Sequence, residues 1–504
     1  MSRVRLFAVI ALVVLSGCTL PGGPDRFDTD RELGYIGDYA HDDVFEFDPS
    51  DGLTADQLEA VKYRTMARLE VVRGLKFERD VALEIVSRDE YRNQRADGIR
   101  NASAFENEVW RGAFVVDGDT DVNRAFDDLY GDSVQGYYVN DRIVIVTDET
   151  DEIRIDRWTL VHELTHALQD QHFGIGRQSE TIDGVRAENG LFEGEANFLP
   201  DRYDRRCGDE WQCLPDAQPT ATSEGLTDRP FNVGLFLSVY VPYAEGPEFA
   251  ADLYDRGGWD AVDRAHDERP TSTAQLIHPD RYPDTDPVDV TVPDRSTDAW
   301  RPVADGGDPR TETVGEATLF ATLWANGAVD RPITAGATER SPYNYSHPAT
   351  AGWAGDAMTV YRSTDGSNRT GHAWRLAWES PSDAAEFTDA YRRLLANEGG
   401  QRVDDADSAA GTEAGTVYRI PDGEPFAGAY RVSITGETVT IVGAPTVDDL
   451  DAIHAHAGGS YANESAAALD PASAGDAESS PTAVAGPATP TSADPGTPRA
   501  SADG

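Results

Sequence analysis

The segment His162-Glu163-Leu164-Thr165-His166 constrains this chain more than any other part of its sequence. Residues four apart lie on the same face of an α-helix, so the two imidazoles can bind one metal ion together. Glu163, next to His162, then points toward a water molecule on that metal. The chain has only 10 histidines in 504 residues, so a chance match to this spacing is expected in roughly one such chain in a hundred. The segment therefore predicts a helix that carries a metal site.

The identity of the third protein ligand decides what such a site can do. The H-E-x-x-H pattern is typical of zinc metallopeptidases, in which three protein ligands leave a fourth position for water. The downstream candidates for the third ligand are Glu188, Glu193, Glu195 and His172. The alternatives are ordinary: the histidines can simply be helix residues, the glutamates can be exposed, and His172 can be a packing or capping residue.

A second motif carries a resemblance to a known family. Residues 190–197 read GLFEGEAN and resemble the second motif of gluzincin metallopeptidases, E-x-x-A, whose first glutamate binds the metal. The resemblance implies Zn²⁺ held by His162, His166 and Glu193. It extends to residues 159–173, 242–246, 257–259 and 273–279, and the chain is similar over about 51–330 to haloarchaeal surface lipoproteins with such a domain. Asn197 departs from the family pattern, which has an aspartate there that braces a ligand histidine.

The resemblance also implies a reaction, the hydrolysis of peptide bonds by a metal-activated water. Glu163 would take the proton of the water and deliver it to the leaving amine. His278 is the candidate donor to the oxyanion, with Tyr243 behind it; His278 before Pro279 can also be a turn residue. The expected strand 142–147 precedes the motif helix, where gluzincins place an edge strand that pairs with substrate. The expected partner is thus an unfolded or flexible polypeptide.

The N-terminus predicts export and a lipid anchor. Residues 1–18 begin with Arg3 and Arg5, continue with an apolar stretch too short to span a bilayer, and end in Leu-Ser-Gly-Cys18. This ending resembles a lipobox, in which the cysteine is lipidated; the alternative is an ordinary signal peptide that contains a cysteine. We expect a protein anchored at Cys18 on the extracellular face of the cell membrane. Outside the cell, Cys207 and Cys213 are expected to form a disulfide rather than part of a metal site.

The charge of the chain indicates a saline environment. The formal net charge is −47, from 90 acidic and 43 basic residues, and the acidic residues are spread over the whole sequence. Such a dispersed excess is typical of proteins that work in very high salt, where screening makes self-repulsion tolerable. It argues against nucleic acid as a partner. An acidic mimic of DNA is the alternative, but such mimics are usually small and lack a targeting segment.

The order of patterns predicts an α+β protein in two parts. After the signal peptide, residues 19–50 are expected to form a flexible tether, 51–330 a mainly helical gluzincin-like domain with a small sheet, 350–460 a smaller α+β domain, and 465–504 a disordered tail. Expected strands are 81–86, 142–147 and 374–379, with a hairpin over 429–442 that turns at Gly436. Expected helices begin with a capping box at Thr54 and Gln57 and include the motif helix, 185–198 ending at Pro200, 232–254 bent at Pro242, 315–324 and 383–396.

Two readings of function other than an active peptidase stay open at this point. The zinc site can persist in a surface lipoprotein that no longer cleaves and serves the cell envelope or binds a partner. The intact Glu163 favours the peptidase, because a purely structural site has no need of the base. A ligand-binding lipoprotein with two similar lobes is the third class, and the sequence shows no internal duplication that would support it.

Overall fold

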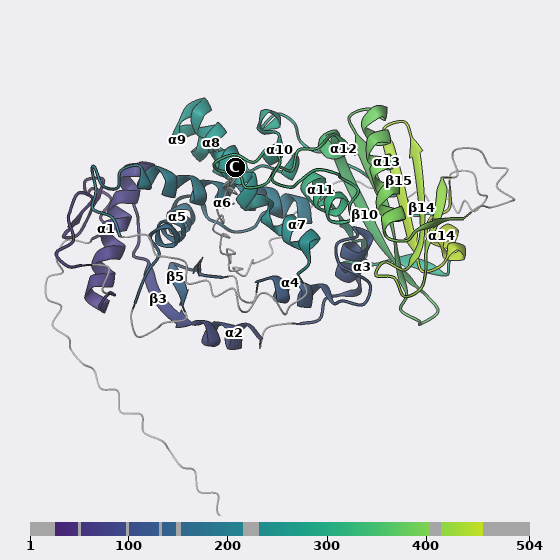
Figure 1. The fold of residues 1–504 in the computed structure, drawn as a ribbon, viewed down its shortest axis with the longest axis horizontal. Coiled ribbons are helices and arrows are strands. Elements are labelled where there is room, and N and C mark those ends of the chain that lie inside the picture. The colour runs from purple at the N-terminus through teal and green to yellow at the C-terminus, as the bar shows by residue number, and fades with distance from the viewer. Residues whose placement is uncertain are drawn as a thin grey trace, which may run out of the picture.

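The computed structural model describes residues 26–48, 52–96, 100–130, 134–147, 153–214, 231–403 and 415–456. Over these residues the protein has the predicted α+β class, with helices through most of the chain and a large antiparallel sheet toward its end (Figure 1). The predicted signal peptide with Cys18 and the predicted tail 465–504 lie outside the described residues. Among the described helices, none is both long and apolar enough to cross a lipid bilayer.

The first helix, α1 (Ala55–Arg73), has the predicted start. The Thr54 side chain accepts a hydrogen bond from the Gln57 backbone, and the Gln57 side chain accepts one from the Thr54 backbone, which completes a capping box. Residues 26–48, expected to be part of a flexible tether, instead pack on this helix. They contain the paired strands β1 (Tyr35–Ile36) and β2 (Tyr39–Ala40).

Two side chains fix this N-terminal segment on α1. Ile36 is fully buried in the core beneath the helix, and Arg31 forms a buried ion pair with Glu70. The Gly- and Asp-rich composition that predicts a linker does not reveal these few anchors, because burial of two side chains leaves the average composition polar.

The small sheet consists of β3 (Ala82–Ser87), β5 (Arg142–Thr147) and β4 (Gly136–Val139). The two predicted strands are confirmed, but β5 lies in the middle, parallel to β3 and antiparallel to β4. The prediction of an edge strand at 142–147 is therefore wrong. Asn140 and Asp141 both adopt positive φ, as the two central residues of a tight hairpin turn do, so the preceding residues fold back and cover that edge as β4.

Helix α6 (Ile182–Asp204) is the central helix of the N-terminal half, the described residues within 26–282, with α5 (Arg157–Phe173), α7 (Val233–Ala244) and α8 (Gly246–Gly257) packed around it (Figure 1). The other helices of this half are α1, α2 (Arg88–Ala96), α3 (Ala104–Gly112), α4 (Val122–Tyr130), α9 (Trp259–Asp267), α10 (Thr273–Ile277) and the 3-10 turn Pro279–Arg281. Helix α11 (Gly315–Ala325) comes later in the chain and packs on α7.

Two proline predictions in this half are wrong. Helix α6 continues through Pro200 to Asp204, because Leu199, Pro200 and Tyr203 are buried and their packing offsets the missing backbone hydrogen bond. The single helix expected at 232–254 is divided, but not at Pro242, which lies inside α7. The break comes at Glu245, between Ala244 and Gly246, and Pro247 then occupies the first turn of α8, where no backbone donor is needed.

The C-terminal part is one antiparallel sheet with helices on both faces. The strand order is β12-β13-β14-β15-β11-β10-β6, and β9 also pairs with β10. The strands are β6 (Trp300–Pro302), β9 (Thr311–Glu312), β10 (Trp353–Ser363), β11 (Thr370–Trp378), β12 (Gln401–Arg402), β13 (Thr416–Ile420), β14 (Gly428–Thr435) and β15 (Thr438–Ala444), with a separate small ribbon of β7 (Ala304–Asp305) and β8 (Asp308–Pro309). The helices are α12 (Pro348–Ala351), α13 (Pro381–Asn397) and α14 (Val447–Ile453). The predicted strand 374–379, helix 383–396 and hairpin turn at Gly436 are confirmed.

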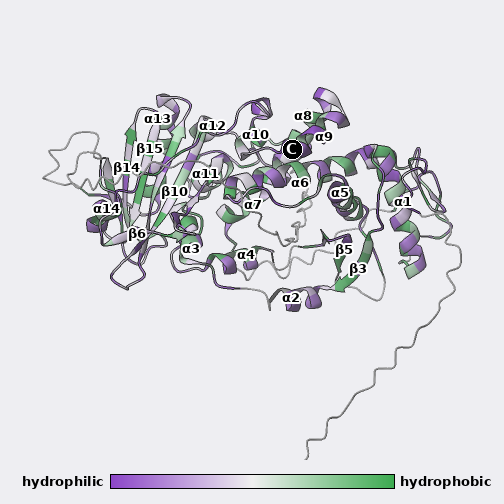
Figure 2. Cartoon of the chain, turned by 180° about the vertical axis from the view of Figure 1, so that it is seen from behind, coloured by the Kyte–Doolittle hydropathy of each residue, from purple (hydrophilic) through white to green (hydrophobic). Residues whose placement is uncertain are grey.

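One hydrophobic core joins the two parts. It runs from Phe105 on α3 through Leu237 on α7 and Phe320 on α11 to Trp374 on β11, and α13 closes it on the same face of the sheet. Helix α14 packs on the opposite face in a smaller cluster. Figure 2 shows hydrophobic residues concentrated in α7, next to this core, while α2 at the surface is largely hydrophilic. The sheet is thus held against the N-terminal half through a shared interior.

Candidate metal centre

The motif helix α5 presents both histidines on one face because its opposite face is anchored. Asp156 caps the helix by accepting a hydrogen bond from the Thr159 backbone. Leu160, Leu164, Ala167 and Leu168 are buried in the core under α1. The predicted helix is therefore confirmed, and its orientation is fixed by packing.

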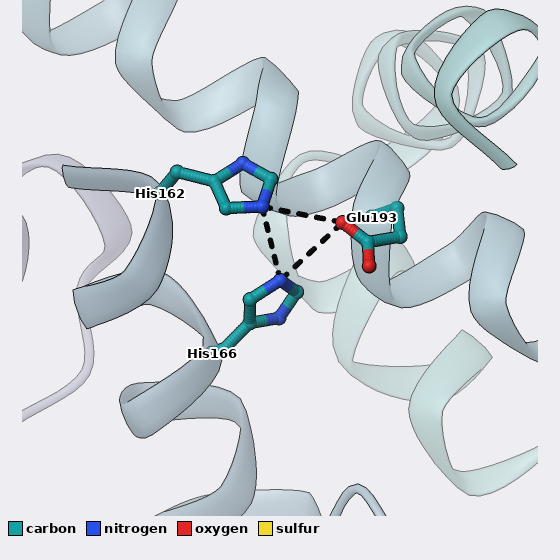
Figure 3. Close-up of side chains that lie close together, drawn as sticks. All are labelled: His162, His166 and Glu193. Carbon is teal, nitrogen blue, oxygen red and sulfur yellow. Dashed lines mark hydrogen bonds and ion pairs between the residues drawn. The ribbon is translucent and has the colours of Figure 1, made fainter. Parts of the chain in front are cut away.

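Three ligand atoms from α5 and α6 converge, as the sequence predicted (Figure 3). The Nε2 atoms of His162 and His166 are 3.1 Å apart. Glu193 Oε2 lies 3.2 Å from the first nitrogen and 3.4 Å from the second. All three side chains are buried, and this group could hold a metal ion.

The two oxygens of Glu193 have different partners. Oε1 accepts a hydrogen bond of 2.8 Å from the hydroxyl of Tyr243 on α7. Oε2, the atom that faces the histidines, is buried and accepts no hydrogen bond from the described residues. Tyr243 thus orients the carboxylate so that one oxygen stays available, and its expected role toward an oxyanion stays a prediction.

The electrostatics of the group favour a positive charge at its centre. Burial opposes ionisation of Glu193, but the imidazoles of His166 and His162 hold the pKa of its carboxyl well below the usual range. Burial likewise disfavours a charged His166, yet the Glu193 carboxylate raises the pKa of that imidazole to about 9. A cation between these groups, whether a proton or a metal ion, is thus stabilised by the same carboxylate.

Glu163 lies beside the ligands in a desolvated position. Burial raises the pKa of its carboxyl, and the nearby Glu193 adds to the rise, while His162 and His166 oppose it. The backbone of Tyr138 on β4 lies beside this carboxyl and also opposes the rise. A buried carboxylate with a raised pKa is a better proton acceptor than an exposed one, so the geometry suits the role of general base predicted for Glu163.

A chain of hydrogen bonds orients the His166 ring through Nδ1, the nitrogen that does not face the metal group. Its Nδ1 atom lies 2.8 Å from Gln169 Oε1, and Gln169 Nε2 donates to Glu195 Oε2 at 2.9 Å. Glu195 in turn pairs with Arg73 and, at 2.6 Å, with His266. Its carboxylate is therefore committed to this buried network, which excludes the alternative of Glu195 as the third ligand.

The second ligand histidine is held differently. The ring of His162 stacks on Trp158, one helical turn earlier, with centroids 5.0 Å apart. Its Nδ1 atom and the Oδ1 atom of Asn197 are both buried without a hydrogen-bond partner among the described residues. Asn197 Nδ2 donates instead to the Glu193 backbone carbonyl at 2.8 Å. The asparagine thus does not brace the ring as the family's aspartate does.

Three other candidates lie in different settings. Glu188 accepts hydrogen bonds from the backbones of Gln178 and Ser179, and the ring of His172 bonds the Lys76 carbonyl. The ring of His278 bonds Glu316 on α11 at 2.9 Å. His278, expected as an oxyanion donor and not as a metal ligand, thus has a partner on α11, and its catalytic role stays a prediction. Elsewhere, Cys207 and Cys213 form the expected disulfide.

Comparisons with known proteins add little beyond the geometry. Residues 301–454 match a domain of unknown function, DUF8575. No curated protein matches the chain, and no solved structure matches it. The match covers the C-terminal sheet and its helices, whereas the metal group lies on α5 and α6, outside it.

Sequence reasoning missed three residues that support the site. Trp158 precedes His162 by four positions and Gln169 follows His166 by three, so helical spacing alone places both next to the ligands. Tyr138 gave no such signal, because it reaches Glu163 only through the pairing of β4 with β5.

Proposed function

We propose that this protein is a zinc-dependent metallopeptidase that hydrolyses peptide bonds at the outer face of the cell membrane. The observation that carries the proposal is the convergence of His162, His166 and Glu193 with Glu163 beside them. The three ligand atoms are 3.1 to 3.4 Å apart. Ligand atoms about 2.0 to 2.1 Å from a tetrahedral zinc ion are separated by about 3.3 to 3.4 Å, so the donor set and its spacing fit zinc.

Different residues of the chain have different roles in the proposed reaction. When bound, the zinc ion supplies Lewis acidity toward water and a peptide carbonyl. Glu163 accepts the proton of the water and delivers it to the leaving amine. Tyr243 holds Glu193 with one oxygen free, and Gln169 holds His166 with its Nδ1 as donor, so that Nε2 keeps its lone pair.

Among the described strands, β4 is at the edge of its sheet, and this edge supports an extended polypeptide as substrate. The Val146 N–H donates to the Gln135 carbonyl at 2.8 Å, which fixes the pairing, so the backbone groups of Gly136 and Tyr138 point away from β5. The backbone of Tyr138 lowers the pKa of the Glu163 carboxyl, which supports a place for this edge beside the general base. An extended chain can pair with such an edge through its main chain, whatever its side chains.

The decisive experiment compares Glu163→Gln with the wild-type protein in molar salt. We expect the variant to retain about one zinc ion per chain and to lose about 10²- to 10⁴-fold in cleavage of a peptide library, because only the proton acceptor is removed. A double His162→Ala and His166→Ala variant should lose the zinc as well. Cleavage by Glu163→Gln at the wild-type rate would rule out the mechanism. Stoichiometric zinc without any wild-type cleavage would favour the silent surface lipoprotein.

The location is a separate part of the proposal and rests on the N-terminal sequence. The apolar stretch that ends in Cys18 favours a lipid anchor. Replacement of Cys18 by serine is expected to release the protein into the medium. A variant that stayed with the membrane fraction would show that the anchor lies elsewhere.

A further inference from the structure

Arg186 is a cation on the same helix as Glu193, and no described residue provides it with an anionic partner. Its side chain is half-buried, its Nε–H is buried and has no hydrogen-bond acceptor, and no described residue forms an ion pair with it. This is unexpected in a chain with 90 acidic residues and 43 basic ones. Desolvation lowers the pKa of the guanidinium, so burial of this charge costs free energy that no anionic partner among the described residues offsets.

The position of Arg186 connects it to the candidate site. It precedes Glu193 by seven residues on α6, and seven residues are close to two full turns, so both side chains leave the same face of the helix about 10.5 Å apart. Arg186 is also within electrostatic reach of Tyr243, whose hydroxyl binds Glu193, and of Tyr130 at the end of α4. The guanidinium therefore faces the same side of α6 as the metal ligand.

We infer that Arg186 forms a subsite for a carboxylate of the substrate, two or three residues from the bond that is cleaved. The distance along α6 matches two or three residues of an extended chain at about 3.3 to 3.6 Å per residue. A guanidinium binds a carboxylate in a planar fork with two hydrogen bonds. The carboxylate is either the C-terminus of the peptide or an acidic side chain, because both present the same two oxygens.

High salt strengthens the argument for direct contact. In molar salt the Debye length is about 3 Å, so an exposed cation attracts a distant carboxylate only weakly. A half-buried guanidinium with an unused donor can still select a carboxylate, because contact excludes the screening ions. The inference rests on the proposed peptidase function for its meaning, but the binding of a carboxylate can be measured without turnover.

The test uses matched fluorogenic peptides in molar KCl. One pair ends in a free carboxylate or an amide, and a second pair carries Glu or Gln two or three residues from the cleaved bond. With wild-type protein we expect that, in at least one pair, kcat/KM is about 10- to 100-fold higher for the peptide with the carboxylate than for its neutral partner. Arg186→Gln should remove this preference and leave cleavage of the neutral peptides and zinc content close to wild type, and Arg186→Lys should restore part of it. The pair that responds identifies the source of the carboxylate.

Two controls keep the result unambiguous. Arg177→Gln removes the same charge from an exposed side chain close to Arg186, and it should leave the preference intact. Binding of the same peptides to Glu163→Gln and to the Glu163→Gln, Arg186→Gln double variant is measured by calorimetry, so that the subsite is tested even if the wild type cleaves nothing. Equal binding and cleavage of acid and neutral peptides by the wild type, or an equal loss on all peptides in Arg186→Gln, would overturn the subsite.

Discussion

At the scale of single residues, the pKa values of buried carboxyl groups in this protein are shifted in two opposite directions, depending on their partners. Glu193 and Glu195 lie against imidazoles or a guanidinium, and these partners hold the pKa of each carboxyl well below its usual range despite complete burial. Asp183, at the start of α6, accepts hydrogen bonds from Thr273, but its Oδ2 atom is buried without a partner among the described residues. Burial raises the pKa of Asp183 to about 7.

The raised pKa of Asp183 predicts a pH dependence of stability. Between about pH 4, near the ordinary pKa of aspartate, and pH 7, the unfolded chain loses the proton while the folded protein keeps it. The folded state then binds more protons, so the free energy of unfolding falls as pH rises through this window, by an amount on the order of 2 to 4 kcal/mol from this group. Asp183→Asn should flatten the fall, as measured by urea unfolding at a series of pH values.

The control for this prediction is Asp280→Asn, which removes an exposed carboxylate. It should leave the slope of stability against pH unchanged. If Asp183→Asn follows the same pH curve as the wild type, Asp183 is ionised in the folded protein and the interpretation of its environment is wrong.

The three residues of the candidate metal group could be predicted from their spacing. Only some of the residues that support this group could be predicted. The spacing of four in His162 and His166 and the E-x-x-A pattern around Glu193 identify groups that meet across two adjacent helices. The hydroxyl of Tyr243 and the backbone of Tyr138 come from elements whose approach depends on tertiary packing, and local sequence carries no information about it.

At the scale of elements, the close approach of α6 to the start of α8 positions the third ligand. Gly194 lies between Glu193 and Glu195, and a Cβ atom on it would overlap the carbonyl oxygen of Gly246. A Cβ on Gly246 would overlap the carbonyl oxygen of Gly190 in the same way. The glycine in the E-x-x-A motif of this chain is thus explained by the contact between two helix backbones.

Gly194→Ala is expected to push α6 away from Gly246 and to move the two glutamates that flank it. We predict a loss of about 1 to 3 kcal/mol in the free energy of unfolding, together with weaker zinc binding in competition with a chelator. Gly176→Ala is the matched control, since a Cβ there meets no atom within 4 Å. Wild-type zinc affinity in Gly194→Ala would show that the helix contact does not position Glu193.

Element prediction succeeded where local signals agree and failed where packing overrides them. The capping box at Thr54 and the strand 142–147 are encoded in neighbouring residues and were found. Pro200 signals a helix end, but buried residues around it carry α6 one turn further. The place of β5 in the middle of its sheet depends on β4, a strand of four residues with too short a pattern to predict.

At the scale of the whole molecule, a buried polar cluster joins the N-terminal half to the domain matched over 301–454. Glu108 on α3 accepts hydrogen bonds from Thr370 and His372 on β11, at 2.7 and 2.8 Å, and pairs with Arg111. Burial opposes its ionisation, but Arg111 and His372 lower the pKa of Glu108 to about 2. The charge is therefore present at neutral pH, inside an interface that also carries the shared hydrophobic core.

This arrangement predicts that the two halves unfold as one unit. Glu108→Gln removes the charge that compensates Arg111 and offers an amide N–H₂ to groups that are themselves donors, so we expect a loss of about 3 to 5 kcal/mol in stability. Because the core is continuous across the interface, the loss of stability should appear in both halves at once. Zinc release is measured by the fluorescence of a chelator, and unfolding of the C-terminal sheet by far-UV circular dichroism. Both signals should change in one transition that is shifted relative to wild type. Glu78→Gln, which removes an exposed carboxylate, should shift neither probe. Two separate transitions in the wild-type protein would show that the shared core does not couple the halves, and the effect of Glu108→Gln would then be confined to the sheet.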